Sequence, residues 1–460
     1  MDQQESSAQI AESYVLKGAD VRVVERFFSV PLDYSKPDGQ KIRVFARSLI
    51  PLDDAKVSAD QQTVDSDRPY FLYLQGGPGF EVNLFSSLDL AAIIHKKGYQ
   101  TLWLDQRGTG LSTPISVSSL TSQTDGEIAQ YLKHFRADNI VRDCEFIRKT
   151  LIGGKKPEED RKWTIMGQSF GGFCATTYLS FHSEGLKEVF LTGGLPPLVD
   201  HPDPVYRRLF ERVAKRNEVY YAKYPRDVQR VRKILSYVGE NNVQFPDSGQ
   251  LTPSRWLQLG FDLGMHAGID RIHQLVLRAA TDLETSGSLS YGLLCAVQSK
   301  QSFDTNPIYA ILHEPLYCQG RAAQWSAHRL LEEHPQFRWE TAKQMDENIP
   351  VYFTGEMIFP GMFDDYANLR PLRRAAELLA AESDWDKLYD ISQLKKNTVK
   401  VNTATYYDDM YVDFELSQET AATIANTEQY ITNQNFHNGI RKNGQEILTT
   451  LFEISKRLKD

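Results

Sequence analysis

The sequence predicts an α/β fold in which a mostly parallel sheet carries helices on both faces and is interrupted by a large, mostly helical insertion. Three observations predict this fold. Short apolar runs alternate with helical patterns up to about residue 200, which is typical of strands and crossover helices in a parallel sheet. A proline-rich segment, Leu195–Pro204, ends the alternation, and helical patterns then dominate. Strand-like sequence returns near residue 399.

The first part of the chain contains six predicted strands. Short runs rich in β-branched and aromatic residues indicate buried strands, and two of them are closed directly by glycine. These runs are Val21–Val30, Lys41–Ile50, Tyr70–Leu74, Thr101–Leu104, Trp163–Met166 and Val189–Thr192. Between the strands, Asp138–Leu151 places apolar residues near the helical period, and Gly171–His182 is a second predicted helix.

Helical patterns dominate from about residue 205 to residue 380. A basic stretch at its start is interpreted as a solvated helix face; it comprises Arg207, Arg208, Arg212, Lys215, Arg216, Lys223, Arg226 and Arg230. Further strands are predicted at Val399–Tyr407, after the helical part, and near Gln429–Thr432, with a closing helix from about Gly439 to Leu458. We therefore expect a core from residues 1–199 and 395–460, with a helical cap insertion at 200–394.

The composition excludes several classes of protein. The net charge of −8 over 460 residues argues against a general nucleic-acid binder, which needs a basic surface. No apolar stretch reaches the length of a membrane span, and the initial residues MDQQESSAQI lack the pattern of a secretory signal. Four cysteines without a CxxC pair, and histidines without HxxxH spacing, predict neither a disulfide framework nor a metal site. We expect a cytoplasmic protein without a metal or cofactor.

The strongest motif is GQSFGG at Gly167–Gly172, which follows one predicted strand and begins a helix. This is the G-x-S-x-G pattern in its strand–turn–helix context. The glycines leave room for a sharp turn that lifts the Ser169 hydroxyl above the sheet edge. The Phe170 N–H, at the start of the helix, can stabilise a developing oxyanion. Ser169 is therefore the predicted nucleophile.

Two glycine-rich loops follow earlier strands. Gln75–Gly79 (QGGPG) comes directly after a strand, where this kind of fold places the second oxyanion donor. We expect the Gly77 N–H to be that donor, with Gly76 as the alternative. The segment Asp105–Gly110 (DQRGTG) is interpreted as structural support, in which an arginine–carboxylate pair braces the loops.

The base and the acid are found from their order, because an acid and then a histidine follow the serine in this kind of fold. Of the histidines beyond Ser169, only His437 follows the return of the strand pattern, in a polar loop before the last helix. Glu356 as the acid would require a histidine soon after the strand near residue 400, and DDMYVDFEL contains none. Asp408 or Asp409 as the acid is consistent with His437 as the base.

These motifs resemble the proline iminopeptidases, or prolyl aminopeptidases, which are serine peptidases on the α/β-hydrolase fold. GGPG, DQRGTG and GQSFGG stand at matching relative positions, and the acid-to-histidine spacing agrees. In the family the acid stands in a GRYDM-like segment. YYDDMY here places Asp409 before Met410, so the resemblance favours Asp409 over Asp408.

The resemblance also implies substrate-binding residues in the insertion, where glutamates hold the substrate's free amine. Glu356, in EMIF, resembles the glutamate of an ENHYF-like segment. Trp325 begins WSAH, which resembles a WSxWE-like segment, so that His328 stands where the family has its other glutamate. Glu314, in LHEPLY, is the candidate replacement. Gln75 stands where the family has a histidine before GGPG.

The function that the resemblance implies is release of N-terminal proline through a Ser-His-Asp triad and an acyl-enzyme, without a metal or cofactor. The expected partners are peptides with N-terminal proline or proline-like small molecules, and neither nucleic acid nor a membrane. A homo-oligomer is left open. The alternative is a small-molecule esterase or amide hydrolase with the same triad, which the departure at His328 motivates. A catalytically dead binding protein would carry a broken triad, whereas this triad is intact in sequence.

Overall fold

The computed structural model describes residues 8–58, 64–120, 122–155 and 157–457. The first seven residues of the segment used for the secretory-signal prediction, and the last residue of the predicted closing helix, lie outside these ranges. Within the described ranges, no helix combines the length and the apolar character that a membrane crossing needs.

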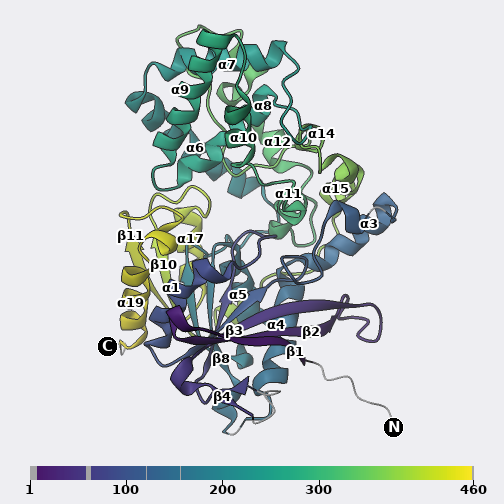
Figure 1. Cartoon of the computed structure of the whole chain (residues 1–460), viewed down its shortest axis with the longest axis vertical. Helices are drawn as coiled ribbons and strands as arrows, with labels where there is room; N and C mark the ends of the chain where they lie inside the picture. Colours follow the sequence, from purple (N-terminus) through teal and green to yellow (C-terminus); the bar gives the residue numbers. More distant parts are fainter. Residues whose placement is uncertain (1–7, 59–63, 121, 156, 458–460) are drawn as a thin grey trace.

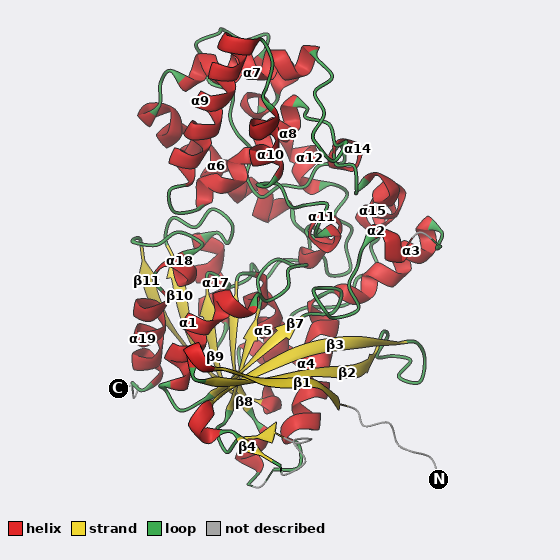
Figure 2. Ribbon diagram, viewed as in Figure 1, coloured by secondary structure: helices red, strands yellow, loops and turns green. Residues whose placement is uncertain are grey.

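A nine-stranded sheet forms the centre of the molecule, with its strands fanned by twist (Figures 1 and 2). The order across the sheet is β1-β2-β3-β7-β6-β8-β9-β10-β11. The pairs from β1 to β7 are antiparallel, and those from β7 to β11 are parallel. The strands are β1 (Ala8–Leu16), β2 (Val21–Pro31), β3 (Lys41–Pro51), β6 (Tyr70–Leu74), β7 (Gln100–Asp105), β8 (Trp163–Gln168), β9 (Leu186–Thr192), β10 (Lys400–Tyr406) and β11 (Thr427–Thr432); β4 (Lys56–Val57) and β5 (Val64–Asp65) form a separate ribbon.

The central strands are buried on both faces, which explains why they read as continuous apolar runs. One face packs against α4 (Ala137–Ile152) and α5 (Phe170–Phe181). The other face packs against α1 (Leu84–His95) and α19 (Gly444–Ser455). This arrangement confirms the predicted class, a mostly parallel sheet with helices on both faces.

Residues 193–399 contain helices and no strand, and many of these helices stand beyond the sheet at one end of the molecule (Figure 1). They are α6 (Asp203–Lys223), α7 (Asp227–Glu240), α8 (Pro253–Leu257), α9 (Gly268–Ser286), α10 (Tyr291–Gln298), α11 (Pro307–Leu312), α12 (Ser326–Leu331), α13 (Trp339–Ala342), α14 (Met362–Asp365), α15 (Arg373–Ala381) and α16 (Ile391–Leu394). The remaining helices are α2 (Val117–Leu120), α3 (Asp125–Leu132), α17 (Phe414–Thr423) and α18 (Gly439–Lys442). We call residues 200–394 the helical insertion.

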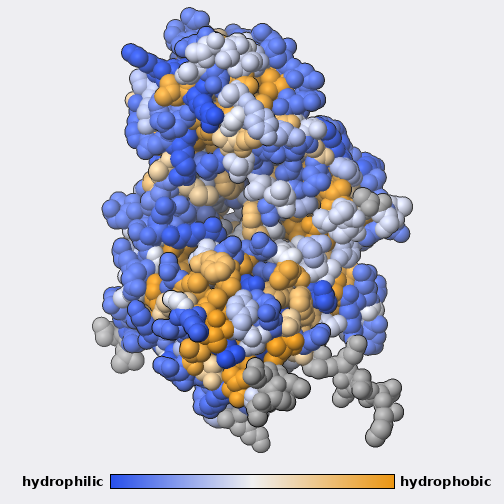
Figure 3. All heavy atoms as spheres, viewed as in Figure 1, coloured by the Kyte–Doolittle hydropathy of each residue, from blue (hydrophilic) through white to orange (hydrophobic). Residues whose placement is uncertain are grey.

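The basic stretch at the start of the insertion is mainly solvated. Five of its side chains are exposed and three are half-buried, and the visible surface of this end of the molecule is largely hydrophilic (Figure 3). One half-buried member ties the insertion to the sheet: Arg212 of α6 bonds to Asp413 at 3.0 Å and also to Glu415. Because both acids follow β10, this contact links α6 to the segment that carries Asp409.

Three local differences separate the structure from the sequence predictions. The closing helix is interrupted at Asn443, which separates α18 from α19. β1 was not predicted, because it is a half-exposed edge strand and its sequence mixes polar and apolar residues. α1 was not predicted, because its apolar residues are spread around the helix rather than gathered on one side.

Candidate active site

Ser169 occupies a strained turn between β8 and α5. Its backbone lies at φ 53°, ψ −125°, a conformation that is costly for a residue with a side chain. Two neighbouring glycines make the turn possible. A Cβ at Gly171 would lie 2.0 Å from the carbonyl oxygen of Leu74, and one at Gly172 would lie 2.1 Å from that of Gly194. The turn therefore needs glycine at both positions, and it presents the serine at the carboxyl end of the central strands.

His437 and Asp409 complete a hydrogen-bonded chain with this serine. The Nε2 atom of His437 lies 2.9 Å from Ser169 Oγ, and its Nδ1 atom lies 2.8 Å from Asp409 Oδ2. The other oxygen of Asp409 accepts the backbone N–H groups of Tyr411 (2.8 Å) and Val412 (3.0 Å). These contacts fix the carboxylate, and the carboxylate fixes the imidazole in the tautomer that can accept the serine proton.

The charges around His437 stabilise the protonated form of its imidazole, the form that results when the histidine takes a proton from the serine. Burial lowers the pKa of His437, but the charge of Asp409 and its hydrogen bond outweigh burial, and Glu356 adds to them, so that the net pKa is raised. Asp409 is almost fully buried, whereas its neighbour Asp408 is exposed. The geometry thus pairs His437 with Asp409 and leaves Asp408 in solvent.

The loop after β6 closes over the serine. A Cβ at Gly76 would lie 3.0 Å from Ser169 Cβ and 2.5 Å from Gln168 Oε1, so the backbone there approaches the nucleophile closely. Gly77 follows at φ +135°. Phe170 is the first residue of α5, where a helix leaves its N–H groups without intrahelical partners. The oxyanion roles of Gly77 and Phe170 stay predictions that this arrangement accommodates.

Glu356 is the one predicted amine-binding residue that lines the same cleft as Ser169 and His437. The hydroxyl of Tyr309 donates a hydrogen bond to its Oε1 atom, and His313 Nε2 lies 3.5 Å from the same oxygen. His313 is in turn 3.2 Å from the hydroxyl of Tyr206 through Nδ1. A network of buried side chains from α6 and α11 therefore orients this carboxylate.

The structure does not bring the other three predicted substrate-binding residues to the cleft. Glu314 is buried, and its two oxygens accept the backbone N–H groups of Ser326 and Ala327, each at 2.9 Å, at the start of α12. Burial raises its pKa to about 8. Trp325 packs edge-on against Phe363, and His328 is exposed on α12. None of the three is among the residues that line the cleft.

The segment Asp105–Gly110 supports the core around the site, although the predicted arginine–carboxylate pair joins it to α4 rather than to the glycine loop after β6. Arg107 is buried and pairs with Asp143 of α4 through Nε at 2.7 Å and Nη2 at 2.6 Å. Asp105 accepts the N–H groups of Val82 (2.9 Å) and Leu111 (3.0 Å). The contact with Val82 holds the loop after β6 against the end of β7, and the Arg107–Asp143 pair holds the segment against α4.

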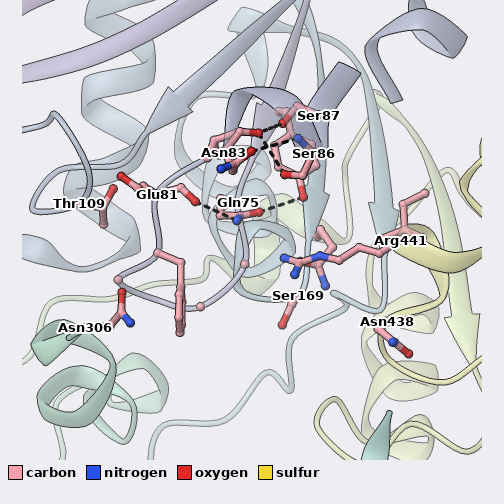
Figure 4. A pocket seen from close by; sticks show the side chains of 18 of the residues that line it. Gln75, Glu81, Asn83, Ser86, Ser87, Thr109, Ser169, Asn306, Asn438 and Arg441 are labelled. Atoms are coloured by element: carbon pink, nitrogen blue, oxygen red, sulfur yellow. Dashed lines mark hydrogen bonds between the residues drawn. The ribbon is translucent and has the colours of Figure 1, made fainter. Parts of the chain in front are cut away.

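The cleft has a volume of about 1290 Å³ and is bordered by both the sheet end and the helical insertion. Figure 4 shows part of its wall. There Gln75 accepts a hydrogen bond from Tyr73 at 3.0 Å and donates one to the Glu81 carbonyl at 3.1 Å. Gln75 thus holds the glycine loop in place from a position beside the serine.

Sequence reasoning missed Tyr309, His313 and Arg441 among the residues of the site and its support. Tyr309 and His313 are four residues apart, so they share one side of α11 and its end, and His313 directly precedes Glu314. Arg441 comes four residues after His437. Proximity to the predicted residues along the chain was the available signal, but it does not show which way a side chain points.

One group of described residues has donor atoms close enough together for a metal: Glu145, His182 and Glu184. The Glu145 carboxylate is already bonded to Arg148 and to the hydroxyl of Tyr178. It lies on α4, away from the residues that line the cleft. Because Glu145 is already bonded and Glu184 is exposed, we assign no metal site to this group.

An α/β hydrolase is defined by three features found here: the sheet order, the sharp turn at the serine, and the acid and histidine after the last two strands. The family model of the alpha/beta hydrolase fold matches residues 69–237. Proline iminopeptidase aneH of Aspergillus aculeatus is 42% identical over 436 residues, which cover 95% of this chain and 94% of that protein. A proline iminopeptidase of Aeromonas sobria is 40% identical over 444 residues, covering 96% of this chain and 98% of its own. The chain belongs to the proline iminopeptidase family.

Proposed function

We propose that this protein is a serine aminopeptidase that releases N-terminal proline from peptides, with Ser169 as nucleophile, His437 as base and Asp409 as acid. The observation that carries the proposal is the unbroken chain from Asp409 through His437 to Ser169, in one cleft with Glu356. Membership of the proline iminopeptidase family supports the substrate.

In the proposed reaction, His437 takes the proton of Ser169 as the hydroxyl attacks the prolyl carbonyl carbon. The Phe170 and Gly77 N–H groups stabilise the oxyanion, and losing one such donor costs about 2.7–4 kcal/mol in the barrier. The C–N bond then breaks as protonated His437 gives its proton to the leaving amine. A water molecule, deprotonated by His437, attacks the prolyl ester and releases proline.

The same geometry supports recognition of an unblocked amine. The cyclic secondary ammonium of an N-terminal proline is a cation with two N–H donors, and Glu356 offers a carboxylate partly shielded from solvent. Tyr309 donates to one oxygen of that carboxylate and leaves the other for the substrate. We further propose that the helical insertion, residues 200–394, acts as a cap that leaves no room for chain upstream of the proline.

The departure at His328 does not favour the esterase alternative, because His328 lies on the exposed side of α12 and outside the cleft lining. The peptidase and the esterase then differ in one testable requirement: only the proposed peptidase needs a substrate with a free N-terminal amine.

A comparison of chromogenic substrates tests the proposal. Prolyl 4-nitroanilide would be assayed beside its N-acetylated form, alanyl 4-nitroanilide and a short-chain 4-nitrophenyl ester, with Ser169→Ala as the control. We expect rapid release from the unblocked prolyl anilide, abolished in Ser169→Ala and strongly reduced by N-acetylation. Rapid ester turnover without release from any prolyl anilide would refute the peptidase and favour the esterase.

A further inference from the structure

The cleft carries an arginine that the proposed reaction does not use. Arg441 lies on α18, four residues after His437, and it lines the same cleft as Ser169 and Glu356. Its side chain extends from α18 into the cleft toward Ser169 and Gln75 (Figure 4). The side chain is exposed, so a solute in the cleft can reach the guanidinium.

Among the described residues, the Arg441 guanidinium has no hydrogen bond or ion pair with another side chain or with a carbonyl oxygen. Other arginines around the site are engaged: Arg107 pairs with Asp143, and Arg212 pairs with Asp413. Lys300, another cation of the cleft wall, lies 3.1 Å from Asp262. Lys96 and Lys442 also line the cleft, but Arg441 is the one of these cations whose charge acts on His437. Arg441 is thus a cation near the reacting groups with its donors unused.

The charges of Arg441 and Glu356 act on the same imidazole from different parts of the fold. Besides the larger effects of burial and Asp409, the charge of Glu356 raises the pKa of His437 and that of Arg441 lowers it. Glu356 belongs to the helical insertion, whereas Arg441 belongs to the core after β11. The reacting serine and histidine therefore lie in a cleft with an anionic group from one part and a cationic group from the other.

A short peptide with N-terminal proline carries its charges in a matching pattern. Its ammonium is in the proline ring, and in a dipeptide the α-carboxylate belongs to the residue that leaves. When Glu356 holds the ammonium and Ser169 faces the scissile carbonyl, the leaving residue must occupy the remaining side of the cleft. Guanidinium groups bind carboxylates through two parallel hydrogen bonds, a geometry that a lysine cannot supply.

We propose that Arg441 binds the free α-carboxylate of a short leaving group, so that the preferred substrates are prolyl dipeptides and similarly short prolyl peptides. This inference rests on the proposed function and defines its substrate class. Two other carboxylates line the cleft, Glu81 and Asp89, and both are exposed. Glu81 precedes α1 and Asp89 belongs to it, and as anions neither can bind the leaving carboxylate.

The test compares two peptides that differ only at the carboxyl end, Pro-Gly and Pro-Gly-amide. The measured quantity is the ratio of their kcat/KM values, which does not depend on how much of a preparation is active. We expect wild type to prefer the free carboxylate about fivefold, mainly through KM, because Arg441 is exposed. The preference should fall as salt is added, because salt screens exposed charges.

Variants at two neighbouring positions locate the effect. Arg441→Gln should bring the ratio close to one, and Arg441→Lys should restore only part of it. Lys442→Gln removes the same charge from the next residue of α18, which also lines the cleft, and should leave the ratio at its wild-type value if the guanidinium of Arg441 is the carboxylate's partner. A wild-type ratio near one, or equal losses in Arg441→Gln and Lys442→Gln, would overturn the inference. Turnover of Pro-Gly-amide by wild type would still uphold the proposed function, whereas no turnover of either peptide would refute that function itself.

Discussion

Replacing Asp409 by asparagine changes one atom of the hydrogen-bonded chain from Asp409 through His437 to Ser169: the carboxylate oxygen that faces His437 becomes an NH2 group. In the structure Asp409 Oδ1 accepts two backbone N–H groups, from Tyr411 and Val412. An asparagine would place its carbonyl oxygen at that position, since only an acceptor satisfies both donors. Its NH2 group would then face His437 Nδ1, which would have to be the unprotonated nitrogen. The proton would move to Nε2, the nitrogen that must accept the proton of Ser169.

The expected loss follows from this change of tautomer. The same substitution behind a catalytic histidine in a serine protease lowers kcat about 10⁴-fold, which corresponds to about 5.4 kcal/mol in the activation free energy. We expect a loss of that order for Asp409→Asn, measured as kcat for an unblocked prolyl anilide. The matched control is Asp408→Asn, because Asp408 is the neighbouring exposed aspartate and its substitution should change kcat less than about twofold.

Two results would refute this reasoning. One is an Asp409→Asn variant that keeps more than about a tenth of the wild-type kcat, since the tautomer argument requires a far larger loss. The other is a comparable loss in Asp408→Asn, which would mean that the acid had been assigned to the wrong residue.

Three further predictions concern the charges around the site and the core that supports it. Because Glu356 contributes to raising the pKa of His437, activity should fall as the pH drops through a value above the ordinary histidine pKa, and Glu356→Gln should move this acidic limb of the kcat/KM profile to lower pH. Tyr309→Phe removes the donor that orients Glu356 and should raise KM for unblocked prolyl substrates about tenfold with a smaller effect on kcat. Arg107→Met leaves the buried carboxylate of Asp143 unpaired and should lower the free energy of unfolding in urea by about 3–5 kcal/mol.

Each of these predictions has a clear contrary outcome. An acidic limb that stays in place in Glu356→Gln would show that this carboxylate does not act on the histidine. Equal effects of Tyr309→Phe on blocked and unblocked substrates would separate the tyrosine from amine recognition. Unchanged urea unfolding in Arg107→Met would contradict a bracing role for the buried pair.

Much of the fold could be predicted because its central strands are buried on both faces. Tyr70–Leu74 has the same bounds in prediction and structure, since a continuous apolar run that ends just before the glycine-rich loop Gln75–Gly79 leaves little choice. The edge strand Ala8–Leu16 was not predicted, because one side of it meets solvent and its sequence carries polar residues. The central strand could be predicted and the edge strand could not because the first is buried on both faces and the second is not; strand propensity does not explain the contrast.

The nucleophile and its partners were also accessible from sequence, whereas the amine pocket was accessible only in part. Ser169, Asp409 and His437 follow a strict order along the chain, and the structure places them within hydrogen-bonding distance. Glu314 was the candidate replacement for the other amine-binding glutamate, yet it caps α12 with both oxygens. A sequence shows that a carboxylate is present in an apolar segment, but its direction depends on packing between segments far apart in the chain.

The most direct test of the central claim is to trap the covalent intermediate and find where the prolyl group sits. Wild-type protein would be mixed with prolyl 4-nitrophenyl ester, quenched in acid within milliseconds and analysed by mass spectrometry of the intact chain and of its peptides. The account predicts a mass increase of one prolyl group on the peptide that contains Ser169, and no such increase in Ser169→Ala. A prolyl group on another residue, or release of proline from peptides by Ser169→Ala at the wild-type rate, would contradict it.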